Sequence, residues 1–269
     1  MFLLSLYKVV RKRDYAIVAG NGGLGDYLAM SGAVRWLHSQ PDRESTYFAC
    51  SPYRITNVKY LFRDLDNFHI VKYGSSPMGF IKGSRSRRRK MHVTLWGGFQ
   101  RWQGRLLRQG LDHRNNHWLE GWYKEIGVPY RAKYENFYVR RDEEREEAVF
   151  KRLGIDPSEK YKLIIKDRVT TKWKTKQRFK PSTSLPTGFK QINPNNIAWN
   201  RHTLIFDWMG VIENANILET VDTGWMHLMK LMMLKPKEDR VKIINASRGV
   251  PCIQGKYFND DWDNGWVIT

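Results

Sequence analysis

Apolar and polar positions along the first part of the chain predict strands that alternate with helices. The segment 15–20 is short, apolar and partly β-branched, which is typical of a buried strand. A glycine-rich turn over 21–26 follows, and beyond it apolar positions recur at helical spacing as far as Leu37. The next expected elements are a strand, a helix and a strand: 45–50, 55–65 and 67–73. Strands that alternate with helices imply a parallel sheet covered on both faces.

The residue composition of the sequence changes near the middle of the chain. Before the change, the pattern predicts a strand with a Gly-Gly turn within 92–106 and a helix within 115–129. An extended segment over 131–139 then meets an acid-rich helix start at Asp142–Glu144, which complements a helix dipole. We therefore expect two domains, 1–138 and 139–269.

The second domain repeats the alternation of strands and helices. Apolar runs predict strands over 160–167, 217–222, 241–246 and 266–269, and a helix over 225–234. Residues 203–216 are expected to form a helix or loop that leads into the second of these strands. The segment 170–200 is polar, basic and interrupted by prolines, so we expect a long loop, which in a compact domain is usually functional or mobile.

Basic residues outnumber acidic ones along the chain. Of its 269 residues, 46 are Lys or Arg and 27 are Asp or Glu, which gives a formal net charge of +19. Such a surface attracts anions, among them nucleic acid, nucleotides and acidic lipid. Nine basic residues and one acidic residue lie from Lys162 to Lys190, and we expect them to line a cleft that draws in a nucleotide diphosphate. The Arg-rich run 82–90 is expected to be a solvated loop.

Two further features bear on the compartment. Cys50 and Cys252 are far apart in the sequence and lack metal-site spacing, so a reducing compartment, the cytoplasm, is expected. No run reaches transmembrane length. The segment 1–13 has an apolar patch followed by basic residues, the reverse of the order in a signal peptide. Peripheral contact with a membrane surface, an edge strand and a helix are the alternatives for it.

Gly23, Gly25 and Asp26 form the first candidate site, at the turn that follows the strand 15–20. Glycines let a ligand approach the backbone closely, and a helix N-terminus favours negative charge. A phosphate cradle of the dinucleotide-binding kind is disfavoured, because the G-x-G-x-x-G pattern is not met and a carboxylate would repel a phosphate. Two interpretations of Asp26 stay open: a carboxylate displayed as a working group, and a carboxylate that caps the helix.

A second glycine turn, Asp222-Thr223-Gly224, lies between the strand 217–222 and the helix after it. Backbone N–H groups at such a turn point toward an anion, and His227 would lie in the first helical turn close to that anion. Asp222 could accept hydrogen bonds from ribose hydroxyls. The alternative is that Thr223 caps the helix and His227 packs in the core.

The two turns together resemble motifs of one enzyme family. "NGGLGDYLAMSGAVRWL" is similar to the GLGD-type opening of the ADP-heptose:lipopolysaccharide heptosyltransferases and related sugar transferases, and the segment 222–227 is similar to their D-[ST]-G-x-x-H motif. The segment 135–155 resembles their interdomain segment. The resemblance implies an α/β fold of the GT-B type, in which two Rossmann-like domains face each other across a cleft.

The family's residue roles can be carried over position by position. They imply that Asp26 is the general base of an inverting transfer from a nucleotide-sugar donor to a glycan or glycolipid hydroxyl. They imply ribose binding by Asp222 and diphosphate binding by the amides of Thr223, Gly224 and Trp225. For the phosphates the resemblance implies a Thr-rich turn with a lysine, which points to Thr170, Thr171 and Lys172, with Arg168 and Lys174 as competing candidates. Glu213 could bind the sugar or base of the donor, and His227 ends the D-[ST]-G-x-x-H motif.

No cofactor or metal is expected at such a site, since the nucleotide sugar is a substrate and helix amides and cations stabilise the leaving diphosphate. The D-x-D match at 64–66 lies between an expected helix and strand and is interpreted as a turn. Two other function classes remain: a basic nucleic-acid-binding protein, which would leave the two glycine turns unexplained, and a catalytically inactive glycan-binding relative. No specific nucleic-acid partner is expected.

Overall fold

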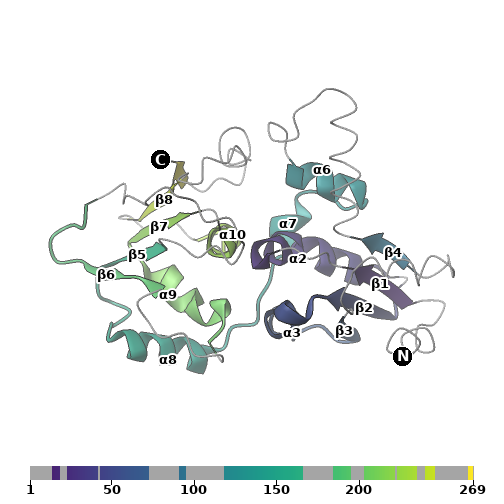
Figure 1. The fold of residues 1–269 in the computed structure, drawn as a ribbon, viewed down its shortest axis with the longest axis horizontal. Coiled ribbons are helices and arrows are strands. Elements are labelled where there is room, and N and C mark those ends of the chain that lie inside the picture. The colour runs from purple at the N-terminus through teal and green to yellow at the C-terminus, as the bar shows by residue number, and fades with distance from the viewer. Residues whose placement is uncertain are drawn as a thin grey trace. The chain divides into compact units, whose positions relative to one another are not determined.

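The computed structural model describes residues 14–18, 23–41, 43–72, 91–94, 118–165, 184–194, 203–221, 223–234, 240–245 and 266–268. The chain divides into two compact units, Met1–Arg140 and Arg141–Thr269. Each unit contains a parallel β-sheet and helices connected to it (Figure 1). The expected division after residue 138 falls close to the boundary between the units.

The first unit is built on a four-stranded parallel sheet with the strand order β3-β2-β1-β4. Its strands are β1 (Asp14–Val18), β2 (Ser45–Cys50), β3 (Phe68–Lys72) and β4 (Met91–Thr94). The sequence pattern predicted all four. In β1 and β2 the paired residues Ile17 and Phe48 are buried, so this part of the sheet belongs to the core.

The helices of the first unit pack around α2, which follows β1. They are α2 (Leu24–His38), the 3-10 helix η1 (Pro52–Arg54), α3 (Ile55–Leu61), α6 (Trp118–Glu125) and α7 (Ala132–Glu135). Residues 27–35 of α2 are all buried, because neighbouring elements cover more than one of its faces. The buried Tyr123 of α6 donates its hydroxyl hydrogen to the Ala29 carbonyl oxygen at 2.7 Å.

The helix α7 corrects an expectation, because residues 131–139 were interpreted as extended. The Ala132 amide donates to the Pro129 carbonyl and so begins a short helix. That helix lies directly against α2 at Gly32, where an added Cβ would stand 2.1 Å from the Ala132 carbonyl oxygen. A helix of four residues is too short to show a helical period in its apolar positions, so the sequence pattern could not predict it.

A buried ion pair fixes the far end of α2 to the turn after α3. Arg35 is only 8% exposed, and its guanidinium donates to both Asp64 carboxylate oxygens at 2.7 and 2.8 Å. It also donates to the Leu61 carbonyl oxygen at 2.8 Å. Burial would raise the pKa of Asp64, but the hydrogen bonds and charge of Arg35 outweigh it and hold that pKa below its ordinary value. The D-x-D match at 64–66 is therefore a structural turn.

The second unit is built on a five-stranded parallel sheet with the order β6-β5-β7-β8-β9. Its strands are β5 (Tyr161–Ile165), β6 (Lys190–Ile192), β7 (Ile217–Val221), β8 (Val241–Asn245) and β9 (Trp266–Ile268). The edge strand β6 corrects the expectation of a continuous loop over 170–200. Only one of its three residues is apolar, so its sequence carries no alternation that could reveal it.

The second unit has four helical segments among its described residues: α8 (Glu143–Leu153), the 3-10 helix η4 (Ile205–Trp208), α9 (Met209–Asn214) and α10 (Gly224–Leu231). As expected from its acidic start, α8 begins after Asp142, whose side chain accepts from the Arg145 amide, and it ends at Gly154 with a φ of +61°. Tyr161 of β5 donates to the Val211 carbonyl oxygen of α9 at 2.7 Å. The fold class expected from the sequence, α/β with two Rossmann-like domains, is thereby confirmed.

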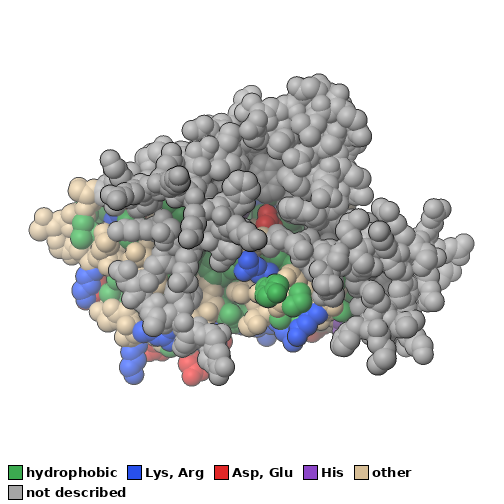
Figure 2. Space-filling model, in the orientation of Figure 1, with side chains coloured by type: hydrophobic (Ala, Val, Ile, Leu, Met, Phe, Trp, Pro, Cys, Tyr) green, Lys and Arg blue, Asp and Glu red, His purple; other side chains and the backbone are tan. Residues whose placement is uncertain are grey.

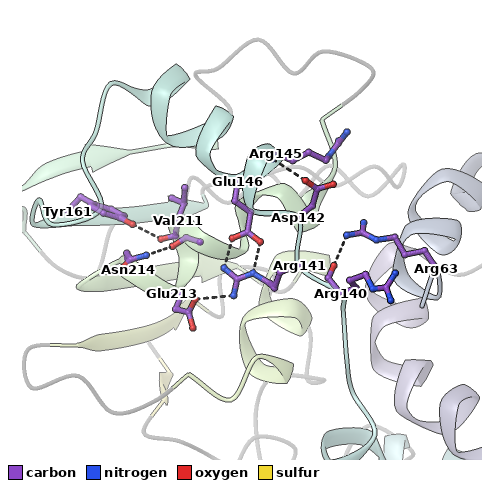
Figure 3. Close-up of polar contacts among 11 residues, drawn as sticks. Arg63, Arg140, Arg141, Asp142, Arg145, Glu146, Tyr161, Val211, Glu213 and Asn214 are labelled. Atoms are coloured by element: carbon purple, nitrogen blue, oxygen red, sulfur yellow. Dashed lines mark hydrogen bonds and ion pairs between the residues drawn. The ribbon is translucent and has the colours of Figure 1, made fainter. Parts of the chain in front are cut away.

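A cluster of charged residues joins α8 to α9 at the start of the second unit (Figure 3). Arg141 donates to the Glu146 carboxylate through two nitrogens and to Glu213 at 3.0 Å. Beside it, Arg145 of α8 donates to both carboxylate oxygens of the buried Asp207 in η4 at 2.7 and 2.8 Å. These ion pairs fix α8 against the segment that leads into β7.

The contact between α2 and α7 generates a prediction. Gly32→Ala places a methyl group against the α7 backbone, which can make room only by moving, so we expect the free energy of unfolding to fall by about 1–3 kcal/mol. Gly23→Ala is the matched control, because a Cβ there meets only the Asp26 Oδ2 at 3.6 Å among the described residues. Urea denaturation of both variants measures the difference, and equal stability of the two would contradict this packing.

Candidate functional site

The direction of strand progression reverses beside β1 in the first sheet. From β1 the chain adds β2 and β3 on one side, and it then returns to place β4 on the other side. In open parallel sheets, ligands bind outside the carboxyl ends of the strands at such a topological switch point. The segment that leaves the carboxyl end of β1 leads to Gly23 and then into the first turn of α2, which contains Gly25 and Asp26.

Gly23 has ordinary backbone geometry, and the described residues leave space beside it. Gly23 precedes the first residue of α2, with a φ of −67° and a ψ of 170°, an extended conformation that any residue adopts. Among the described residues, a Cβ at this position would meet only Asp26, at an ordinary contact distance of 3.6 Å. Neither backbone strain nor packing against the described residues therefore requires glycine at position 23.

Asp26 lies in the first turn of α2, three residues after Gly23. Its amide donates to the Gly23 carbonyl oxygen at 3.1 Å, so Asp26 is a helical residue and Gly23 occupies the N-cap position. The interpretation of Asp26 as the N-cap residue is therefore wrong. The carboxylate is partly exposed, and negative charge in the first turn interacts favourably with the helix dipole.

The residue after Asp26 fixes this turn to the neighbouring strand. Tyr27 is buried, and its hydroxyl oxygen accepts from the Ser51 amide at 3.2 Å, directly after the carboxyl end of β2. Its ring also contacts Phe48 of β2 edge to face, with centroids 6.3 Å apart. Asp26 is thus displayed from a helix start whose orientation is held by buried contacts.

The second sheet has its switch point between β5 and β7. From β5 the chain places β6 on one side, and β7, β8 and β9 follow on the other. The turn after β7 leads into α10 through residues 222 and 223, of which Asp222 lies outside the described residues. Both glycine turns singled out in the sequence therefore lie at the carboxyl edge of a parallel sheet, each beside that sheet's switch point.

Thr223 occupies the N-cap position of α10 without capping it. Its φ of −148° and ψ of −179° are extended, and its side chain does not cap this helix start. The Thr223 Oγ1 is buried and makes no hydrogen bond within the described part of the chain. The alternative that Thr223 caps the helix is wrong in this structure. A helix start with aligned amides and a buried hydroxyl that has no partner among the described residues suits an anionic ligand.

The residues that follow Thr223 line the same helix start. Gly224 and Trp225 are the first two helical residues, and the His227 amide donates to the Thr223 carbonyl oxygen at 3.3 Å. His227 is partly exposed, so the alternative that places it in the core is wrong. The Trp225 ring stands edge-on against Trp208, with centroids 5.6 Å apart, which fixes the first turn of α10 to η4.

Glu213 lies away from this turn. It is on α9, just before the amino end of β7, whereas Thr223 follows the carboxyl end of that strand. Its side chain is 54% exposed and paired with Arg141 at 3.0 Å. A five-residue strand spans about 17 Å, so the structure does not bring Glu213 and Thr223 together. The remaining predicted donor residues, Arg168, Thr170, Thr171 and Lys172, lie outside the described residues, as does Lys174.

Two of the basic residues expected to line a cleft have structural partners instead. Lys162 is buried in β5 and paired with Glu219 of β7 at 2.6 Å. Lys190 of β6 is paired with Glu159 at 2.6 Å. The others in the interval 162–190 lie outside the described residues. Figure 2 shows Lys and Arg side chains at several places on the described part of one face, with Asp and Glu side chains near some of them.

Other chemistries find little support in the described residues. Burial raises the pKa of the Cys50 thiol to about 12, although Lys59 and Lys72 lower it, so this cysteine stays protonated and is a poor nucleophile. Within the described ranges, no three His, Cys, Asp or Glu side chains are grouped so that they could hold a metal ion. A search of the same ranges finds no helix with the length and apolar character needed to cross a membrane.

The two units, each with a parallel sheet, have the two-domain Rossmann-like α/β fold of the GT-B type. No protein-family model and no curated protein matches the chain. Among solved structures, it is similar to a glycosyl transferase family 9 protein from Veillonella parvula, with a TM-score of 0.56 and 10% identity over 96% of this chain and 87% of that one. It is also similar to the ADP-heptose lipopolysaccharide heptosyltransferase II of E. coli, with a TM-score of 0.55 and 10% identity over 95% and 90%. The resemblance noted in the sequence is thus confirmed at the level of the fold.

The start of α8 is capped by a side chain, whereas the Thr223 side chain does not cap the start of α10, and this difference can be tested. Thr223→Val removes a buried hydroxyl that makes no hydrogen bond within the described residues, so we expect the ligand-free protein to keep its free energy of unfolding or to gain about 1 kcal/mol. Asp142→Ala removes a side chain that does cap its helix, and should cost about 1 kcal/mol. Denaturant unfolding measures both changes. A loss for Thr223→Val as large as that for Asp142→Ala would show that Thr223 is a structural cap.

Proposed function

We propose that this chain is a glycosyltransferase that moves a sugar from a nucleotide-sugar donor to a hydroxyl group of a glycan or lipid-linked acceptor. The observation that carries the proposal is the position of the two glycine turns. One presents a carboxylate and the other an uncapped helix start, and each lies at the switch point of its own parallel sheet. The likeness of the whole chain to two solved structures described as a glycosyl transferase and a heptosyltransferase supports the same function.

Asp26 is proposed to activate the acceptor. Its carboxylate takes the proton of the acceptor hydroxyl while that oxygen attacks the anomeric carbon of the donor sugar. The bond from this carbon to the diphosphate breaks at the same time, and its electron pair leaves with the nucleoside diphosphate. Attack from the side opposite the leaving group inverts the anomeric centre. General base catalysis of this kind typically contributes about 10²–10⁴-fold to the rate.

The start of α10 is proposed to bind the donor. Negative charge develops on the leaving diphosphate, and preorganised amide groups stabilise such charge without reorganising. The amides of Thr223, Gly224 and Trp225 and the Thr223 hydroxyl supply donors at this position, with His227 in the same helical turn. Asp222 is proposed to bind the ribose, and the basic residues of 168–172 the phosphates. The proposal requires neither a metal ion nor a cofactor.

The enzyme is proposed to act in the cytoplasm on a glycan or a glycolipid acceptor. For a lipid-linked acceptor, the apolar and basic segment 1–13 would contact the membrane surface peripherally.

The proposed base is tested by Asp26→Asn. The amide keeps the shape of the side chain but cannot accept the proton, so we expect the turnover number to fall by about 10²–10⁴-fold while nucleotide affinity stays within about twofold. Asp66→Asn is the matched control, because Asp66 is an exposed aspartate in the turn that precedes β3, at the opposite edge of the same sheet. Turnover comes from the nucleoside diphosphate released in the presence of acceptor. Unchanged turnover in Asp26→Asn would remove this residue as the base.

The donor site is tested by thermal unfolding in the presence of UDP, GDP, ADP, CMP and their common sugar conjugates, each with and without EDTA. A ligand that binds only the folded protein raises the melting temperature by mass action. The rise grows with the ratio of the ligand concentration to its dissociation constant. We expect one nucleotide to raise it, with the same shift in EDTA. A shift that disappears in EDTA would contradict metal independence.

The net charge of +19 favours one rival, a nucleic-acid-binding protein, and the same experiment distinguishes it. The rival predicts that oligonucleotides stabilise the protein strongly and that no nucleotide sugar does. It also predicts that oligonucleotide binding weakens steeply with added salt, because phosphate contacts release counterions. That pair of results would replace the transferase with the rival.

A further inference from the structure

Among the residues of α10, only those of the first turn are partly exposed. Gly224, Trp225 and His227 are partly exposed, whereas the residues from Leu228 to Leu231 are all buried. In an α-helix each Cα–Cβ bond is tilted toward the N-terminus, so the side chains of the first turn lean over the start of their own helix. Trp225 has the largest of these side chains, and it therefore leans toward the place proposed for the leaving diphosphate.

A second tryptophan holds the Trp225 ring in place. Trp208 is 1% exposed, and the two rings are edge to face, with an angle of 86° between their planes and centroids 5.6 Å apart. A pair with this geometry is attractive beyond the apolar area that it buries. An indole that is already fixed loses little conformational freedom when a ligand covers its exposed part. Trp225 therefore offers a preformed apolar surface beside the helix start.

The contact between the two tryptophans lies on the side of α10 toward β5. Trp208 ends η4, which leads directly into α9, and α9 is connected to β5 by the hydrogen bond from Tyr161 to the Val211 carbonyl oxygen. The helix α10 itself follows β7. Because β5 and β7 flank the switch point, Trp225 connects the helix after one of these strands to the segment packed on the other. Ligands of open parallel sheets bind at this position.

The three ring systems of a nucleotide sugar differ in how well they suit this surface. The nucleobase is flat, but the ribose separates it from the phosphates. The ribose is bonded to a phosphate, but its five-membered ring is small and puckered. A six-membered donor sugar is bonded directly to the diphosphate, and it presents a face of C–H groups that can cover an indole ring, as apolar and aromatic side chains do in ligand sites. The donor sugar fits the position of Trp225 best.

We propose that the Trp225 side chain is the platform on which the donor sugar stacks, so that this residue contributes to the preference for a nucleotide sugar over the free nucleoside diphosphate. The inference deepens the proposed function and rests on it for the identity of the ligand. It adds a side-chain role to a residue whose backbone amide alone was assigned to the diphosphate. After transfer the sugar is gone, so the product lacks this contact and dissociates more readily than the donor.

The test compares two substitutions of Trp225. Trp225→Phe keeps a flat ring beside Trp208, whereas Trp225→Leu keeps apolar bulk without a ring. Calorimetry measures the affinities of UDP, GDP and ADP and of UDP-glucose, GDP-mannose and ADP-glucose for the wild type and both variants. For the nucleotide that the wild type binds, Trp225→Leu should weaken binding of the sugar conjugate by about three- to tenfold. The nucleoside diphosphate should bind as it does to the wild type, and Trp225→Phe should keep most of the affinity for the sugar conjugate.

Tyr138→Ala is the control, because it removes an exposed aromatic side chain elsewhere. Tyr138 is 53% exposed, and its ring centroid lies 5.4 Å from the Arg35 guanidinium carbon, near the opposite end of α2 from Asp26. This variant should bind the sugar conjugate and the nucleoside diphosphate as the wild type does. Urea unfolding of each variant shows whether it is folded under the conditions of the binding measurement.

Equal losses of affinity for the sugar conjugate and the nucleoside diphosphate in Trp225→Leu would overturn the inference, because Trp225 would then hold the helix start or contact the nucleoside. Undiminished affinity for the sugar conjugate would overturn it too, as would equal losses in Trp225→Leu and Trp225→Phe. A Trp225→Leu variant that does not fold would make Trp225 a structural residue and would have the same effect. All of these results leave the proposed function standing. A wild type that binds none of the six compounds would overturn the proposed function and this inference with it.

Discussion

Parallel pairing of strands is the constraint on which the rest of this structure depends. A parallel pair cannot be closed by a tight turn, so the chain must cross over after every strand and re-enter the sheet from the same edge. All carboxyl ends therefore collect at one edge, and the turns that leave them collect there as well. In both units this edge holds the residues whose chemistry the sequence singled out, Asp26 in one and Thr223 in the other.

In the second sheet, the polar groups at the amino ends of the strands differ from those at the carboxyl ends in their hydrogen bonding. At the amino edge, backbone and side-chain hydrogen bonds close the structure: Asn216 bonds Tyr161 through both its side chain and its amide, and its carbonyl accepts from Val241. Glu213 and Arg141 are paired near the same edge. At the carboxyl edge, the Thr223 side chain does not cap the start of α10, and its buried hydroxyl makes no hydrogen bond within the described residues. The proposed donor site lies at this second edge.

Ion pairs with at least one buried partner connect elements that are far apart in the sequence. Arg35 joins α2 to the turn at Asp64, Arg145 joins α8 to η4 through Asp207, and Lys162 joins β5 to β7 through Glu219. Each pair has a geometric requirement that apolar contacts lack, because separating the partners leaves a charge in a poor environment. The apolar core gives this fold most of its stability, and these pairs add polar contacts between its elements.

The sequence by itself determined the alternation of strands and helices, the acid-rich start of α8, and the two glycine turns with their acids. These features are local: they follow from periodicity, from acidic residues that complement a helix dipole, and from the placement of glycine after an apolar run. Only the tertiary structure decided that α7 is helical, that β6 is a strand and that Lys162 is paired with Glu219. Each of these depends on a partner distant in the sequence, and a local pattern contains no information about such a partner.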